Sequence, residues 1–131
     1  MRPTKIWANL GVKHVEETRR FYTDLGFKSN EGPTKSKELT SFLIGDSDFV
    51  VHFFAADSLK DAMKGELADL TRGSEVIFTL WAESKEEADA WATEVRQAGG
   101  TIFSEPAEFG KGYYGFGFAD PDGHKWNVFH M

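Results

Sequence analysis

An internal repeat of predicted elements constrains the fold of these 131 residues more than any other feature. A strand, a helix and three further strands occur in that order in each half. In the first half we predict a helix over residues 15–25 and strands over residues 5–12, 27–30, 38–44 and 49–54. In the second half we predict a helix over residues 84–98 and strands over residues 74–82, 101–104, 112–119 and 125–130. An order of elements that occurs twice predicts two similar modules.

The two halves also align residue by residue. A shift of 70 positions takes Glu16 onto Glu86 and Phe21 onto Trp91. We therefore expect a single domain over residues 1–131, with two modules of the order βαβββ at about 4–54 and 74–131. A polar connector over residues 55–73, with a short helix predicted over 57–64, joins them.

Local signals set the limits of the predicted elements. The first helix has its apolar residues at helical spacing, and Gly26 follows it where a C′ glycine is expected. Two polar stretches, residues 31–37 and 105–110, are predicted to be loops, and the second contains Pro106. These signals place the functional candidates below on strands.

A turn near the C-terminus joins the last two predicted strands. Asp120-Pro121-Asp122-Gly123 has proline where a turn needs a fixed φ and glycine where it needs a positive φ. In the strand that follows, alternation puts Trp126 and Val128 on one face and Asn127 and Phe129 on the other. His124, directly after the turn, is expected to be exposed.

Composition excludes several classes of function. The net charge of −6 argues against a surface for nucleic acid or for anionic membranes. No apolar run could cross a bilayer and the N-terminus resembles no signal peptide, so we expect a cytoplasmic protein. The absence of cysteine excludes disulfides and thiolate chemistry. Aromatic residues make up 15% of the chain, enough for both a core and the wall of an apolar pocket.

Three stretches resemble one known superfamily. They are residues 7–12 with the helix that ends before Phe27, residues 98–101, and residues 118–126 around the turn. Their tandem arrangement resembles the vicinal oxygen chelate superfamily of glyoxalase I, bleomycin-resistance proteins and extradiol dioxygenases. Small proteins labelled as predicted lactoylglutathione lyases are the most similar. The resemblance implies an α+β fold, in which tandem βαβββ repeats form a cupped mixed sheet with the helices outside.

The resemblance also implies which residues line the cup. Strand alternation then turns Gly11, Ile77 and Thr79 toward its concave side. The residues expected to contact a ligand are Trp7, Asn9, His52, Trp81, Tyr113, Tyr114, Asn127 and Phe129. Six of them also have a structural alternative: the two tryptophans as core residues, the two tyrosines as ordinary strand residues, His52 as a cavity-wall residue and Asn127 as a satisfied amide within the sheet. One of the two tyrosines should point inward.

Members of the superfamily that use a metal hold it with four strand positions. The resemblance places these positions at Trp7, His52, Ile77 and Asn127. Tryptophan and isoleucine cannot bind a metal, and asparagine is a weak ligand. The sequence therefore predicts no metal and no other cofactor.

The functional prediction is a metal-free protein that binds a small organic molecule in an aromatic-lined cup. The alternative is a metal-dependent lyase, isomerase or dioxygenase of the lactoylglutathione-lyase type that uses His52, because an imidazole can both donate and accept a proton. We assign no catalytic residue. The resemblance also implies a homodimer.

Overall fold

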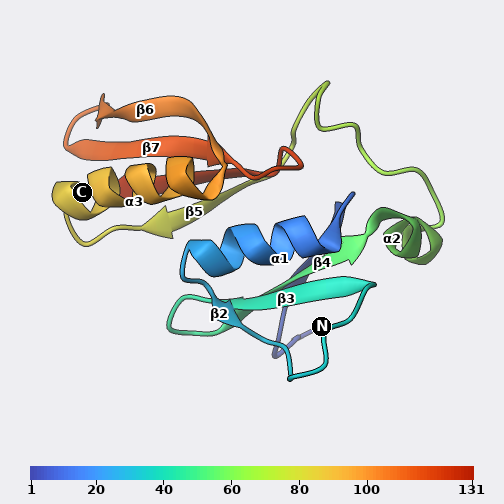
Figure 1. The fold of residues 1–131 in the computed structure, drawn as a ribbon. Coiled ribbons are helices and arrows are strands. Elements are labelled where there is room, and N and C mark those ends of the chain that lie inside the picture. The colour runs from blue at the N-terminus through green and yellow to red at the C-terminus, as the bar shows by residue number, and fades with distance from the viewer. The chain divides into compact units, whose positions relative to one another are not determined.

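The computed structural model describes residues 1–131 and consists of two compact units, Met1–Leu67 and Ala68–Met131. Each unit contains a four-stranded mixed sheet and a long helix, so the fold is α+β, as predicted (Figure 1). The boundary between the units falls within the predicted connector. The single domain over residues 1–131 and the cup formed by the two modules stay predictions.

The first unit is built on a sheet with the strand order β1-β4-β3-β2. Its elements are β1 (Trp7–Val12), α1 (Val15–Asp24), β2 (Lys28–Ser29), β3 (Leu39–Ile44), β4 (Phe49–Ala55) and α2 (Ala56–Met63). Strand β1 runs parallel to β4, and the other pairs are antiparallel. Helix α1 packs on one face of this sheet, where Tyr22 stacks on Phe53 with ring centroids 4.5 Å apart.

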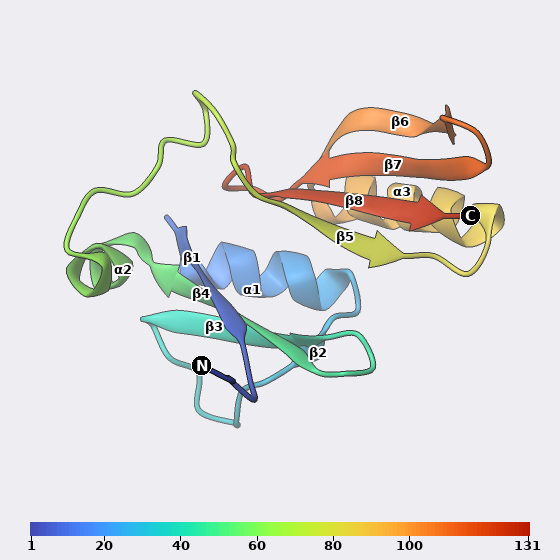
Figure 2. The same ribbon diagram turned by 180° about the vertical axis from the view of Figure 1, so that it is seen from behind.

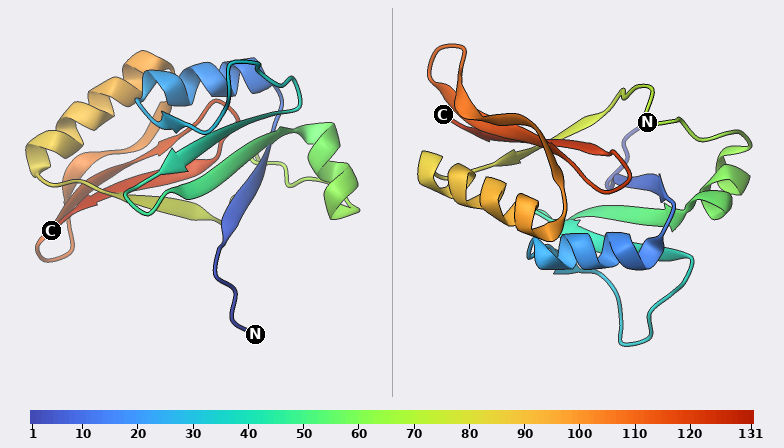
Figure 3. Two further views of the ribbon diagram at one scale, coloured as in Figure 1. Left: turned by 90° about the horizontal axis from the view of Figure 1, so that it is seen from below. Right: turned by 45° about the horizontal axis from the view of Figure 1, so that its top comes forward.

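The second unit repeats this topology with the strand order β5-β8-β7-β6. Its elements are β5 (Ile77–Trp81), α3 (Lys85–Ala98), β6 (Thr101–Phe109), β7 (Tyr113–Ala119) and β8 (Lys125–His130). Helix α3 lies along one face of the sheet, and the view from behind shows the other face (Figures 2 and 3). Phe116, Phe118, Trp126 and Val128 are buried in the core of this unit. The predicted alternation in β8 is confirmed.

The two long helices end in the same way. Gly26 has a φ of +83°, and the N–H groups of Gly26 and Phe27 donate to the carbonyls of Thr23 and Tyr22 at 2.9 and 3.0 Å. Gly99 has a φ of +95°, and a matching pair of bonds closes α3. Both pairs have the pattern of a Schellman motif. The predicted C′ glycine is confirmed, and the shared motif supports the internal repeat.

The prediction for β6 is wrong in its length. A loop was expected over residues 105–110, but the strand continues to Phe109. Two register shifts, between Ile102 and Ser104 and between Ser104 and Ala107, interrupt its pairing with β7. The second shift contains Pro106, which cannot donate to a ladder and is tolerated at bulges and on edge strands. A proline therefore marks an irregularity here and does not end the strand.

The turn over residues 120–123 forms as predicted, but His124 is not exposed. The N–H of Gly123 donates to the carbonyl of Asp120 at 3.0 Å, and Gly123 has a φ of +100°. The side chain of His124 is only 10% exposed, because its Nδ1–H donates to the buried Asp120 carboxylate at 2.9 Å. Asp120 thus anchors both the turn and the histidine that follows it.

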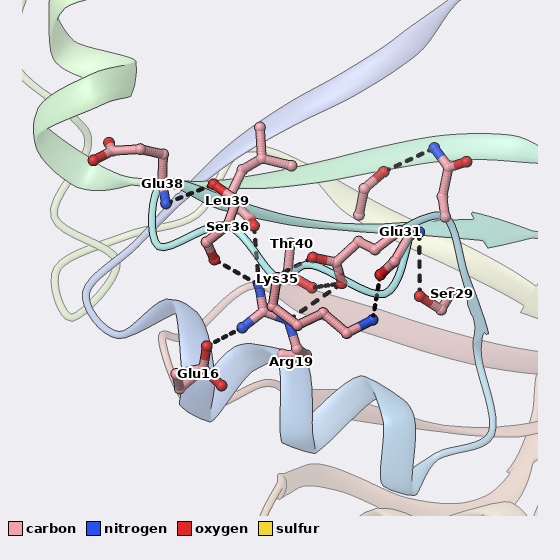
Figure 4. A network of polar contacts seen from close by, with 12 residues as sticks. Glu16, Arg19, Ser29, Glu31, Lys35, Ser36, Glu38, Leu39 and Thr40 are labelled. Carbon is pink, nitrogen blue, oxygen red and sulfur yellow. Dashed lines mark hydrogen bonds and ion pairs between the residues drawn. The ribbon is translucent and has the colours of Figure 1, made fainter.

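A buried ion pair holds the loop after β2 against α1 (Figure 4). The guanidinium of Arg19 donates to both carboxylate oxygens of Glu31, from Nε at 3.2 Å and from Nη2 at 3.0 Å. Nη2 also donates to the carbonyls of Ser36 and Leu39 at 2.8 and 3.1 Å. The hydroxyl of Thr40 donates to Glu31 at 2.8 Å. This network connects the helix, the loop and β3.

Two residues of the connector cover one end of the first sheet. Helix α2, predicted over residues 57–64, spans Ala56–Met63. A methyl group on Gly11 would lie 2.5 Å from Leu67 and 3.3 Å from Leu59, so both leucines lie against the backbone of β1. None of the helices has the length and apolar character that a membrane crossing requires. The cytoplasmic location stays a prediction.

Candidate functional site

Equivalent rows of residues cross the two sheets on the faces away from α1 and α3. In the first sheet His52 of β4 has Asn9 and Ser41 as its partners in register. In the second sheet Asn127 of β8 has Thr79 and Gly117 as its partners. Strands β4 and β8 occupy the same place in the two strand orders, and the shift of 70 positions takes Asn9 onto Thr79. His52 and Asn127, the partners of these two residues in register, are therefore equivalent residues of the repeat.

Both equivalent residues carry a buried atom that lacks a hydrogen-bond partner. These atoms are Nδ1 of His52 and Oδ1 of Asn127. A buried polar atom left unpaired costs about 1–3 kcal/mol, and such atoms are uncommon in folded proteins. A ligand that bonds to such an atom removes this cost. The two atoms therefore mark candidate ligand anchors, one in each unit.

The second unit has a cavity of about 270 Å³ beside Asn127. Its volume is just below the ~300–1,000 Å³ that is typical of small-molecule sites. Apolar residues and two glycines dominate its wall, which consists of Ile77, Phe103, Ser104, Glu105, Ala107, Phe109, Gly115, Phe116, Gly117, Asn127 and Phe129. No lysine, arginine or histidine belongs to it, and its one carboxylate, on Glu105, is paired with Arg96. The cavity is thus an apolar space with few polar anchors.

Four of the predicted contact residues lie in or near this cavity. Asn127 and Phe129 line it directly. Tyr113 extends the aromatic wall, because its ring stacks on Phe109 at 5.8 Å and lies 6.3 Å from Phe129. Trp81 pairs in register with Phe129 and is about half exposed. The structure brings these residues together on one face of the second sheet.

Tyr114 lies on the other face of that sheet, against α3. Its hydroxyl donates to the carboxylate of Asp89, and the ammonium of Lys85 lies 5.4 Å from its ring centroid. The hydrogen bond to Asp89 raises the pKa of Tyr114 above its ordinary value. One of the two adjacent tyrosines points toward the cavity, as expected of neighbours on a strand, and it is Tyr113.

The remaining predicted contact residues belong to the first unit. Trp7 and Asn9 are exposed on β1, and the His52 ring lies 5.8 Å from Phe54 in an edge-on arrangement. These residues do not line the cavity of the second unit. Asn9 and His52 form a separate polar row with Ser41, whose hydroxyl oxygen accepts a hydrogen bond from Asn30 at 3.1 Å.

Several cavity residues escaped the sequence analysis. Phe103 and Phe109 stand on β6. Phe109 lay in the predicted loop, and the bulge that directs Phe103 was not visible in the sequence. Gly115 and Gly117 were interpreted only as strand residues, although their alternation with phenylalanine was a usable signal. Glycine inside a strand often marks close approach of another group. Here a methyl group on Gly117 would lie 2.5 Å from the Phe103 ring.

The residues present do not fit a metal held by the protein. Of the four positions that the resemblance assigns to ligands, Trp7 and Ile77 offer no donor atom, and Asn127 offers only an amide. The structure contains no group of three or more histidine, cysteine, aspartate or glutamate side chains arranged to hold a metal ion. No chemical step below is therefore assigned to a metal.

A comparison with protein families gives one match over nearly the whole chain. The model described as Glyoxalase/Bleomycin resistance protein/Dioxygenase superfamily matches residues 6–128. No curated protein matches the chain.

Solved structures share the fold. A hypothetical protein from S. aureus is 30% identical with a TM-score of 0.86, and the match covers 100% of this chain and 96% of that one. A glyoxalase-related enzyme from Fulvimarina pelagi is 19% identical with a TM-score of 0.82, covering 97% and 88% of the two chains. A lactoylglutathione lyase from Agrobacterium tumefaciens is 20% identical with a TM-score of 0.69, covering 98% and 94%. The two more distant matches show the fold alone.

Proposed function

Because the chain belongs to the Glyoxalase/Bleomycin resistance protein/Dioxygenase superfamily, we propose that it binds a small organic molecule in the aromatic cavity of its second unit. Phe103, Phe109 and Phe129 supply apolar surface. Binding of this kind needs an apolar space and a few well-placed polar groups. It needs no metal.

The unpaired Oδ1 of Asn127 carries this proposal. It is a hydrogen-bond acceptor in the wall of an apolar cavity, and no protein group donates to it. A ligand with an O–H or N–H group can satisfy it, whereas a carboxylate has no hydrogen to donate. The wall also lacks a cationic side chain that would pair with an anion. The preferred ligand is therefore an uncharged aromatic molecule with one hydrogen-bond donor.

A ligand screen by thermal shift tests the proposal, since a molecule that binds the native state raises the unfolding temperature. The informative probes are pairs that differ only in the donor, such as a phenol and its methyl ether. We expect the phenol to bind the wild type more tightly by about 3- to 10-fold, the value of one hydrogen bond. In Asn127→Leu, a variant of similar shape without the acceptor, this preference should disappear. A preference that survives in the variant would count against Asn127 as the anchor.

The unpaired Nδ1 of His52 supports a second candidate function, proton transfer in a lyase or isomerase reaction without a metal. Its neighbours in register, Asn9 and Ser41, offer amide and hydroxyl groups that could orient a polar substrate. Activity toward a substrate found by screening should then fall by about 10²-fold or more in His52→Gln, because general acid–base catalysis contributes on that order. Unchanged activity in His52→Gln would eliminate this candidate.

We also propose that two copies of the chain form a homodimer, as the superfamily resemblance implies. Large apolar side chains, among them Trp81 and Phe109, stay exposed on the second unit. Exposed apolar surface of this kind is typical of interaction sites. Light scattering at micromolar concentration should give twice the monomer mass of 14.7 kDa. A monomer mass would refute the proposal.

A further inference from the structure

Phe103 occupies an unusual place beside the cavity. It stands in the first bulge of β6, where residues 103 and 104 lie opposite Gly117 alone. A bulge redirects the side chain it carries, and the Phe103 ring turns onto the second sheet. A methyl group on Gly117 would lie 2.5 Å from two carbons of this ring, so the ring rests directly on the backbone of β7. Yet Phe103 is 46% exposed, far more than a core phenylalanine.

Three features surround the place that the Phe103 ring takes. Gly117 lies under the ring. The ammonium of Lys125 lies 5.0 Å from the ring centroid. Asn127, with its unpaired Oδ1, is the partner of Gly117 in register and lines the same cavity. A flat aromatic group at this place therefore has a surface below it, a cation beside its face and a hydrogen-bond acceptor in the same cavity wall.

We propose that this place is a subsite for an electron-rich aromatic ring, and that Phe103 fills it until such a ligand displaces it. The inference rests on the proposed function and specifies the class of ligand. The phenylalanine ring packs on Gly117 and contacts the Lys125 ammonium, but it has no donor for Oδ1 of Asn127. A phenol or an indole can make all three contacts, with Gly117, Lys125 and Asn127, because its ring is electron-rich and its O–H or N–H can donate. The ligand thus makes one bond that the displaced side chain cannot make.

The charge of Lys125 refines this class. A cation attracts the face of a ring through the ring quadrupole. An electron-poor ring or a saturated ring loses this attraction. Phenol, anisole and cyclohexanol separate the contributions: phenol offers ring and donor, anisole the ring alone, and cyclohexanol the donor alone. The expected order of affinity is phenol first, and the other two behind it.

Titration of the full-length protein by ¹H–¹⁵N NMR tests the inference, with the three probes added to wild type and Phe103→Ala. Removing the internal ring should raise phenol affinity by about five-fold or more, since alanine no longer competes for the place. Cyclohexanol affinity should rise less in Phe103→Ala than phenol affinity does. In the double variant Phe103→Ala/Lys125→Met, phenol affinity should be about two- to five-fold lower than in Phe103→Ala, which is the value of one exposed cation–π contact. Cyclohexanol affinity should not change with Lys125→Met.

Gly117→Ala is the matched control. Its methyl group fills the space that Phe103→Ala empties, so the double variant Phe103→Ala/Gly117→Ala should lose the gain for phenol. The spectrum of each variant shows directly whether it is folded. If phenol shifts no cavity resonance in wild type or in Phe103→Ala, the proposed function itself fails. If phenol binds the cavity of wild type but Phe103→Ala gives no gain, or gives cyclohexanol an equal gain, only the subsite is overturned.

Discussion

Removing the positive charge of Arg19 should destabilise the first unit strongly. In Arg19→Met the apolar stem remains, but the carboxylate of Glu31, whose side chain is 8% exposed, loses its partner. Methionine has no hydrogen-bond donor in its side chain, so the carbonyls of Ser36 and Leu39 also lose the donor that Arg19 supplies. Breaking a buried ion pair from one side costs about 3–5 kcal/mol. The exposed contact of Arg19 with Glu16 adds about 1 kcal/mol at most. We expect a loss of about 3–5 kcal/mol in the free energy of unfolding.

Urea denaturation followed by circular dichroism measures this loss. Arg20→Met is the matched control, since Arg20 is the exposed neighbour on the same helix and should change the free energy of unfolding by less than about 0.5 kcal/mol. The double variant Arg19→Met/Glu31→Gln should be more stable than Arg19→Met alone, because no unpaired charge stays buried. The reasoning is refuted if Arg19→Met costs no more than Arg20→Met.

The same ion pair predicts a pH dependence. Burial acts to raise the pKa of Glu31, but the hydrogen bonds from Arg19 and Thr40 and the charge of Arg19 outweigh it and hold the pKa below its ordinary 4.5. This stabilisation is complete above that ordinary pKa, which applies to the unfolded chain, and is lost as the pH falls through the lower folded pKa. In Arg19→Met the hydrogen bonds and the charge of Arg19 are gone, and only the Thr40 hydrogen bond and the charge of Lys35 still act against burial. Protonation of Glu31 should therefore destabilise that variant less than the wild type. The difference in stability between wild type and variant should therefore narrow in acid.

Three further substitutions test other parts of the structure. Gly26→Ala should cost about 1 kcal/mol of unfolding free energy, because Gly26 has a φ of +83°. Gly32→Ala, at an exposed position without a positive φ, should cost less than half as much. Equal losses in urea denaturation would argue against the helix cap. Ser84→Ala should cost about 1 kcal/mol by the same assay, since its hydroxyl accepts a helix N–H at 3.0 Å, and no loss would show that the bond contributes nothing. In Asp89→Asn the raised pKa of Tyr114 should fall, and an absorbance titration identical to that of wild type would contradict the hydrogen bond.

Much of the fold follows from local patterns in the sequence. The order of elements, the positions of α1 and α3 and the C′ glycine at Gly26 are short-range features, set by periodicity and by backbone conformation. The alternation of Trp126 and Val128 with Asn127 and Phe129 is local in the same way. The length of β6 was not predictable on this basis, because the pairing with β7 continues past Pro106 only by means of two bulges.

The candidate site was predicted in part, for a physical reason. The shared face of Asn127 and Phe129 follows from alternation along β8, and both residues line the cavity. Phe103 required knowledge of the bulge, and the role of Gly117 required knowledge of which ring lies above it. His124 was mistaken for an exposed residue because its pairing with Asp120 depends on the folded turn. Contacts between strands are not visible in the periodicity of either strand.

The irregular β6 also affects how the second sheet can meet another chain. It is the outermost strand of its sheet, and an unbroken edge would offer its N–H and C=O groups to a passing strand. Two bulges disturb that row of groups, and Pro106 in the second bulge has no N–H to offer. At the corresponding edge of the first sheet, β2 is only two residues long. Both of these edges are thus poor templates for fibril growth. Any strand pairing between copies would therefore involve β1 or β5, the end strands on the other side of each sheet.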